Sequence, residues 1–82
     1  MKDLTGKVVI VTGGASGIGA AIVKRLGREG ARIALFDINP EAGEAMAGAC
    51  EGEVQFFQVD ITSMDTVESA VDAVENQLGP VW

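Results

Sequence analysis

The chain has 82 residues, 48% of them hydrophobic, and a formal net charge of −6, a composition that fits one small folded domain and argues against disorder or nucleic-acid binding. With Cys50 as the only cysteine and no histidine, the sequence excludes an internal disulfide, a zinc site of Cys and His ligands, and a His-based catalytic triad. Because no internal disulfide is possible, we expect a cytoplasmic chain. No apolar run approaches the roughly 20 residues of a membrane span, so we expect no membrane partner, and likewise no metal or nucleic-acid partner.

The first half of the chain alternates strand-like and helix-like segments. Residues 7–12 form a short apolar run rich in β-branched residues, typical of a strand buried on both faces. Residues 31–37, ARIALFD, predict a second strand. Between them, apolar spacing predicts a helix that ends near Gly30 and whose inner face carries Ile18, Ala21, Ile22 and Leu26.

The second half repeats the alternation. Asn39 followed by Pro40 predicts the start of a helix that reaches about Cys50. Residues 53–60 predict a third strand, and Thr62 with Asp65 resembles a capping box. The last helix ends at Gly79-Pro80, its inner stripe consisting of Val67, Val71, Val74 and Leu78, and its solvated face of Glu68, Asp72 and Glu75. We expect Met46, Met64 and Cys50 to pack in the core.

Three strands alternating with three helices predict β-α-β units and a parallel sheet. We expect an α/β fold with the order β-α-β-α-β-α, a three-stranded sheet of order 3-2-1, and the first two helices on one face.

The glycines lie where the first strand meets the first helix. Gly13, Gly17 and Gly19 follow a G-x-x-x-G-x-G spacing, with Gly14 in addition and without the lysine of an ATP-type phosphate loop. A helix that starts there points free N–H groups and the positive end of its dipole at an anion. Asp37 lies 18 residues after Gly19, close to the roughly 20 expected for a carboxylate that binds ribose hydroxyls. A tight structural turn and a solvated Asp37 are the alternative interpretation.

The stretch TGGASGIG, residues 12–19, resembles the cofactor loop of the short-chain dehydrogenases/reductases. GKVVIVTGG, LFDIN and VDIT are similar to further stretches of that family, and together they cover essentially the whole chain. The resemblance implies a Rossmann-type fold and NAD as the cofactor. It implies that Gly13, Ser16 and Ile18 lie along the phosphates, and that Gly17 and Gly19 of the same loop also belong to the cofactor site. It also implies contacts with the ribose for Asp37, and with adenine for Asp60 and the backbone of Ile61.

The resemblance also implies what is missing. The family's catalytic Asn, Ser and Tyr-x-x-x-Lys follow an Asn-Ala-Gly stretch on a fourth strand, and the sequence has no tyrosine. We therefore expect residues 1–82 to be the N-terminal dinucleotide-binding segment of a longer oxidoreductase that acts on an alcohol or ketone. The catalytic half is absent, and the segment by itself is inactive.

Two other interpretations stay open: a structural, self-associating module without ligand affinity, and a flavodoxin-like anion-binding signalling domain. If the chain were a flavodoxin-like domain, the occurrence of Asp37 and Asp60 at these positions would be a coincidence. Without a fourth strand, residues 8–11 form an unprotected sheet edge, so we expect a homodimer or larger assembly. We also expect only weak binding of the dinucleotide, because half of its site is missing.

Overall fold

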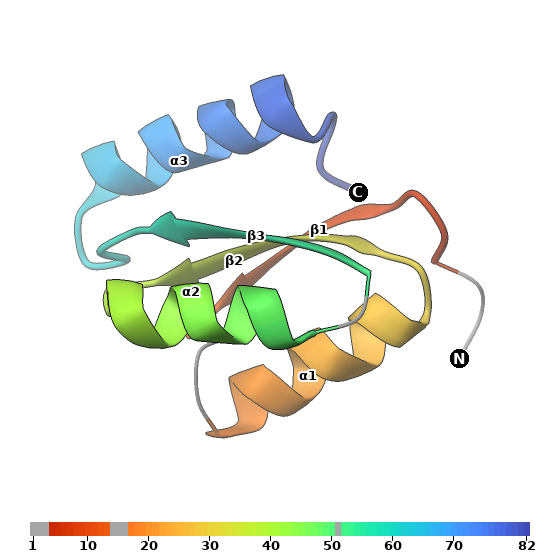
Figure 1. Ribbon diagram of the computed structural model, residues 1–82. Coiled ribbons are helices and arrows are strands. Elements are labelled where there is room, and N and C mark those ends of the chain that lie inside the picture. Colours follow the sequence, from red (N-terminus) through yellow and green to blue (C-terminus); the bar gives the residue numbers. More distant parts are fainter. Residues whose placement is uncertain (1–3, 14–16, 51) are drawn as a thin grey trace.

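A computed structural model describes residues 4–13, 17–50 and 52–82 of the chain. Three strands alternate with three helices (Figure 1), in the order β1 (Val8–Thr12), α1 (Gly17–Arg28), β2 (Arg32–Asp37), α2 (Pro40–Ala49), β3 (Glu53–Gln58) and α3 (Met64–Gln77). The strands pair in parallel in the order β1-β2-β3. The predicted fold class is therefore confirmed as a three-stranded part of a Rossmann-type sheet, with each strand one or two residues shorter than expected.

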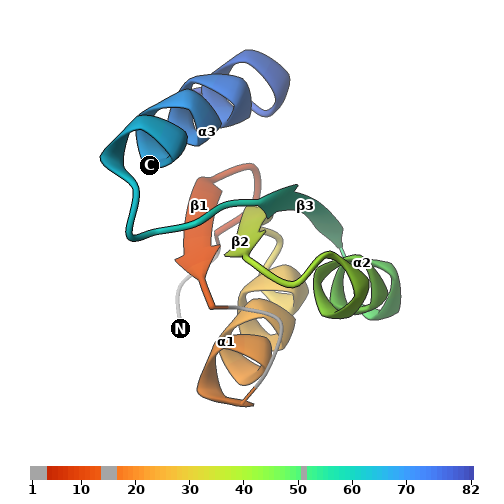
Figure 2. The ribbon, with the colours of Figure 1, turned by 90° about the vertical axis from the view of Figure 1, so that its left-hand side faces the viewer.

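The sheet is covered on both faces. Helices α1 and α2 lie on one face and α3 lies on the other (Figures 1 and 2), as predicted from the order of the strands. None of the described helices is long and apolar enough to cross a membrane.

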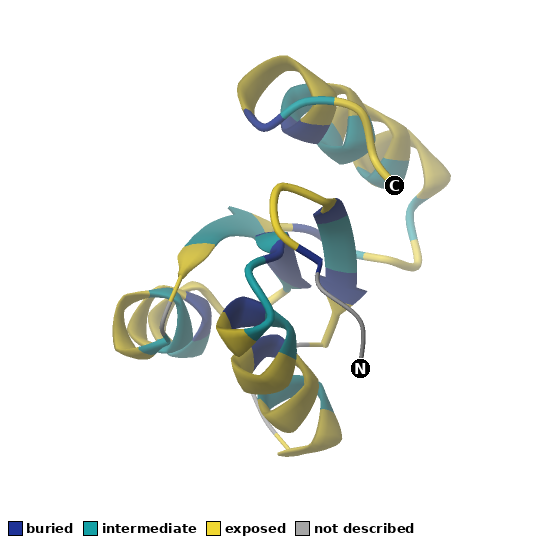
Figure 3. Cartoon of the chain, turned by 90° about the vertical axis from the view of Figure 1, so that its right-hand side faces the viewer, coloured by how far each residue is buried: buried dark blue, intermediate teal, exposed yellow. Residues whose placement is uncertain are grey.

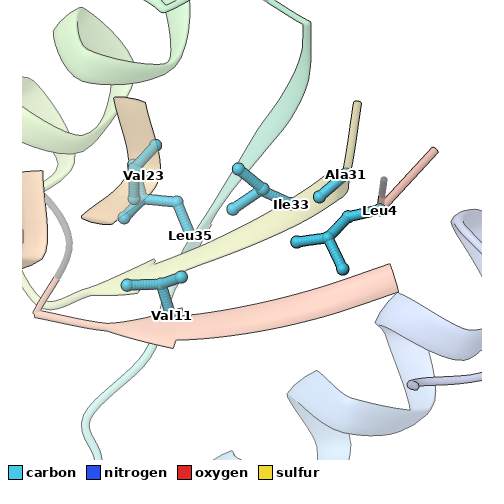
Figure 4. Close-up of a cluster of buried hydrophobic side chains, with 6 residues drawn as sticks. All are labelled: Leu4, Val11, Val23, Ala31, Ile33 and Leu35. Atoms are coloured by element: carbon cyan, nitrogen blue, oxygen red, sulfur yellow. The ribbon is translucent and has the colours of Figure 1, made fainter. Parts of the chain in front are cut away.

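One of the two core clusters lies between the sheet and α1. Figure 4 shows six of its buried side chains pointing toward one another: Leu4, Val11, Val23, Ala31, Ile33 and Leu35. On the opposite face, a second cluster packs under α3 and consists of Val8, Ala34, Phe36, Val59, Val74 and Leu78. The central strand β2 contributes to both clusters, which explains its continuous apolar sequence.

The prediction for the inner face of α1 is wrong, because the buried positions are offset by one residue from the predicted ones. Ile18 is 82% exposed and Ile22 is 44% exposed, whereas α1 rests on the sheet through the buried residues Val23 and Gly27, with Leu26 packed beside them. A buried glycine carries no hydrophobic signal in the sequence, yet it lets the helix backbone come close to its neighbours. Gly27 does come close to another backbone segment, since a Cβ on Gly52 would lie 2.9 Å from the Gly27 carbonyl oxygen.

The start of α3 also differs from the prediction. Ser63 caps the helix, its hydroxyl accepting from the Thr66 N–H at 3.5 Å, because the hydroxyl of the expected cap, Thr62, donates to Asp60 instead. Met64, expected in the core, is 68% exposed in the first turn. The rest of α3 is as predicted (Figure 3): the Val67-to-Leu78 stripe packs on the sheet, and Glu68, Asp72 and Glu75 are exposed.

One guanidinium group joins three elements at the amino ends of the strands. Arg32 Nε and Nη2 on β2 donate to the two carboxylate oxygens of Glu53 on β3 at 3.1 and 2.9 Å. Arg32 Nη1 donates to the carbonyl of Leu78, which caps the end of α3. These contacts lower the pKa of Glu53, chiefly through the hydrogen bond from Arg32.

The lowered pKa predicts how acid affects stability. Because Glu53 has a lower pKa in the folded chain than in the unfolded chain, the ion pair stabilises the fold above the ordinary pKa of a glutamate. That contribution is lost as the pH falls through the folded-state value. In the wild type, the urea concentration at the midpoint of unfolding should fall as the pH is lowered from about 5 to about 3. We expect a smaller fall in Glu53→Gln. The difference should be small, because both side chains of the ion pair are partly exposed. Glu44→Gln, on an exposed residue that forms no ion pair with the described residues, is the control and should follow the wild type; equal curves for all three chains would contradict the prediction.

Candidate functional site

A cleft of about 370 Å³ opens at the carboxyl ends of the three strands, the edge that faces the viewer in Figure 2. The register brings these ends together, because Thr12 pairs with Phe36 and Asp37 pairs with Gln58. The lining comes from all three strand ends: Gly13, Phe36, Asp37, Ile38, Val59, Asp60, Ile61 and Thr62. This is the edge at which open parallel sheets bind their ligands.

Apolar side chains form the walls of the cleft, and two carboxylates lie among them. Phe36 and Val59 are 1% and 3% exposed, and the Phe36 ring packs against the Phe57 ring in a T-shaped arrangement, with 5.9 Å between the ring centroids. Ile38 and Ile61, which follow β2 and β3, are 60% and 59% exposed. Such a lining suits a flat apolar ring that carries polar groups on its edge.

Asp37 is the last residue of β2 and is half-buried. Its Oδ1 accepts a hydrogen bond from the Asn39 N–H at 3.0 Å. Asn39 in turn caps α2, its side-chain oxygen accepting from the Ala42 N–H at 3.1 Å. The carboxylate of Asp37 is therefore held between the end of a strand and the start of a helix.

Asp60 follows β3 and is held in a similar way, with one additional donor. Its Oδ1 accepts from the Thr62 N–H at 2.9 Å and from the Thr62 hydroxyl at 2.6 Å. Both hydrogen bonds, the hydroxyl first, lower the pKa of Asp60. This side chain is therefore a charged acceptor at neutral pH.

Two glycines flank the connection between β1 and α1: Gly13 follows β1 and lines the cleft, and Gly17 begins α1. Gly13 and Gly17 have φ values of +64° and +58°, a left-handed conformation that favours glycine. A Cβ at either position would meet nothing within 4 Å, so the backbone conformation, and not crowding, requires glycine there. The first turn of α1 carries no acidic residue, which leaves its positive end open to an anion.

The structure brings together half of the predicted site residues. Gly13, Asp37, Asp60 and Ile61 line the one cleft. Gly17, Ile18 and Gly19 form the first turn of α1 and are not among the lining residues. Ser16 lies outside the described residues.

Sequence reasoning missed four lining residues: Phe36, Ile38, Val59 and Thr62. Each is next to, or two residues from, a predicted carboxylate, so the neighbours of Asp37 and Asp60 were the signal that could have identified them. None of the lining residues is basic. Among the residues that the structure describes, no group of three or more His, Cys, Asp or Glu side chains could hold a metal ion.

Known proteins match this chain over almost all of its length. A family model described as short chain dehydrogenase matches residues 7–82. The chain is 49% identical over 71 residues to a 2,5-dichloro-2,5-cyclohexadiene-1,4-diol dehydrogenase of Sphingobium indicum, and 51% identical over 71 residues to the sex determination protein tasselseed-2 of Zea mays. Both matches cover 87% of this chain but only 28% and 21% of the relatives. The chain therefore spans less than a third of the length of these relatives.

Solved structures agree in fold. A putative short-chain dehydrogenase from Novosphingobium aromaticivorans superposes with a TM-score of 0.88 at 34% identity, over 99% of this chain and 31% of that structure. A citronellol catabolism dehydrogenase of Pseudomonas aeruginosa superposes with a TM-score of 0.92 at 30% identity, over 99% of this chain and 36% of that structure.

Proposed function

The chain belongs to the short-chain dehydrogenase family, and we propose that it binds the adenosine half of NAD for an oxidoreductase that acts on an alcohol or ketone. The observation that carries this proposal is that Asp37 and Asp60 line the same apolar cleft at the carboxyl ends of adjacent strands. When bound, NAD supplies or accepts the hydride; the residues of this chain bind and orient it.

Each part of the adenosine half has a matching group. Ile38 and Ile61 would contact the purine ring, and Asp60 with the backbone of Ile61 would bind its polar edge. Asp37, held by Asn39, would accept hydrogen bonds from the ribose hydroxyls. The pyrophosphate would lie beside Gly13 and Ser16, which precede α1, and beside the first turn of α1, which contains Gly17, Ile18 and Gly19.

The catalytic step needs groups that this sequence does not contain. A proton donor with a suitable pKa must be positioned at the reacting oxygen, and the family's donor is a tyrosine, a residue type that is absent here. We therefore propose that the 82 residues bind the cofactor without turning over substrate. A cytoplasmic location belongs to the same proposal, since a single cysteine gives no internal disulfide to maintain.

Selectivity for NAD over NADP tests the proposal. A 2′-phosphate would face the carboxylate of Asp37, and the cleft lining offers no basic side chain to offset the repulsion. We expect ADP-ribose to bind at least about tenfold more tightly than its 2′-phosphate by calorimetry, since like charges at such a site cost on the order of 1.4 kcal/mol or more. Asp37→Ser should reduce this preference.

The outcomes separate the alternatives. Tighter binding of the phosphorylated compound would contradict the role of Asp37. Binding of neither compound at millimolar concentration would favour the alternative function, a structural and self-associating module. Because only the adenosine half of the site is proposed here, weak binding is expected even for ADP-ribose.

A further inference from the structure

Thr62 places both of its donors on one oxygen of the Asp60 carboxylate. The N–H at 2.9 Å and the hydroxyl at 2.6 Å both reach Oδ1, whereas no donor from the described residues reaches Oδ2. Asp60 and Thr62 both line the cleft. The two carboxylate oxygens therefore have different surroundings, one occupied by Thr62 and the other left as an acceptor.

The segment that carries these two residues is anchored to α3. The carbonyl of Asp60 accepts from the Ser63 N–H at 3.1 Å and from the Thr66 hydroxyl at 3.4 Å. The Thr66 hydroxyl also donates to the Ser63 carbonyl at 3.0 Å, and Ser63 is the cap of α3. Rotation of the Asp60 side chain is thus restricted by Thr62, and movement of its backbone is restricted by the helix.

We propose that Thr62 is a positioning residue that fixes the Asp60 carboxylate with Oδ2 as its free acceptor, and thereby selects a purine with an amino group at position 6. This inference rests on the proposed adenosine site. An acceptor held in one orientation favours the 6-amino group of adenine over the 6-keto oxygen of hypoxanthine, because a keto oxygen opposite a carboxylate leaves two acceptors facing each other. The lowered pKa of Asp60 supports the same role, since the group stays an acceptor at neutral pH.

The test compares AMP with IMP, which differ at position 6, by titration of the 82-residue chain followed by NMR. The wild-type chain is expected to bind AMP about tenfold more tightly, the effect of one charge-assisted hydrogen bond. Thr62→Val, which removes the hydroxyl and keeps the shape, should reduce this ratio at least about threefold, and Thr62→Ser should restore it. A merely structural role would lower both affinities together and leave the ratio unchanged.

Asp60→Asn tests the positioning directly. If the two donors of Thr62 hold Oδ1 as the acceptor, the amide nitrogen must take the place of Oδ2 and donate to the keto oxygen of IMP. The preference should then invert toward IMP. In the double variant with Thr62→Val the amide is less restrained, and the ratio should return toward one.

Two results would overturn the inference, and they are distinguishable. A Thr62→Val chain that keeps the wild-type ratio, while Asp60→Asn changes it, removes the role of Thr62 and leaves the nucleotide site intact. A wild-type chain that binds neither nucleotide, or binds both equally, removes the adenine site itself and the role of Thr62 with it.

Discussion

Replacing Gly43 by alanine is expected to remove a large part of the stability of this chain. Gly43 is buried in α2, and a Cβ on it would overlap the ring of Phe56 on β3. Relief of such an overlap moves the helix or the ring, at about 1–3 kcal/mol or more. Cores of this size supply roughly 3–5 kcal/mol in total. Urea denaturation followed by circular dichroism measures the loss.

Gly48→Ala is the matched control, because it makes the same substitution in the same helix. A Cβ at Gly48 meets nothing within 4 Å, so only the helix propensity changes, and alanine should stabilise the fold by up to about 1 kcal/mol. Equal effects of the two substitutions would show that α2 does not pack on β3 as described.

The second large effect is on association: we expect the 82-residue chain to form dimers or larger assemblies through the edge of β1. Residues 81 and 82 reach this edge at one point, where Val81 pairs with Val8 and the Trp82 N–H donates to the Val8 carbonyl at 2.9 Å. Lys7 lies over the Trp82 ring at 5.4 Å. In the described part of the chain, pairing on this side of β1 extends no further.

The open part of the edge follows from the pairing with β2. The Lys7 carbonyl and the Gly13 N–H bond to β2, so alternation along the strand directs the N–H and C=O groups of Ile10 and Thr12 away from it. Unpaired groups on an apolar strand form a template for a second strand. A second copy of the chain, related by a two-fold axis, would satisfy both edges at once.

Light scattering after size exclusion measures this association. Thr12→Pro removes an outward N–H at the exposed end of β1 and is tolerated on a sheet edge, so it should raise the dimer dissociation constant at least about tenfold. Thr12→Val keeps the N–H and should associate like the wild type. A wild-type chain that stays monomeric at high micromolar concentration would contradict the expectation.

The sequence predicts those elements whose signals are local. The continuous apolar run of β2 and the stripe from Val67 to Leu78 identify a buried strand and the inner face of α3, and the structure agrees with both. Of the cleft carboxylates, Asp37 was predicted from its place at the end of a strand, 18 residues after Gly19. Asp60 was predicted only through the family resemblance, and both residues line the cleft.

Competition between neighbouring polar groups, and contacts between residues distant in sequence, account for what the sequence did not predict. Thr62 and Ser63 are both suitable helix caps, and only the nearby carboxylate of Asp60 decides that Thr62 bonds to it while Ser63 caps α3. On α1, Gly27 is buried but has no side chain that would mark it as part of the inner face. Arg32 has its partners 21 and 46 residues away, too far for any local pattern.

The most direct measurement of the central claim is the map of backbone amide shifts in the ¹⁵N-labelled chain on titration with NAD. Binding of the adenosine half at the carboxyl ends of the strands predicts the largest, saturable shifts at Gly13, Asp37, Asp60 and Ile61, with smaller ones at the start of α1. Residues on the outer face of α3, such as Glu68 and Asp72, should not move. Saturable shifts confined to α3 or to the amino ends of the strands, or no shift at millimolar NAD, would contradict it.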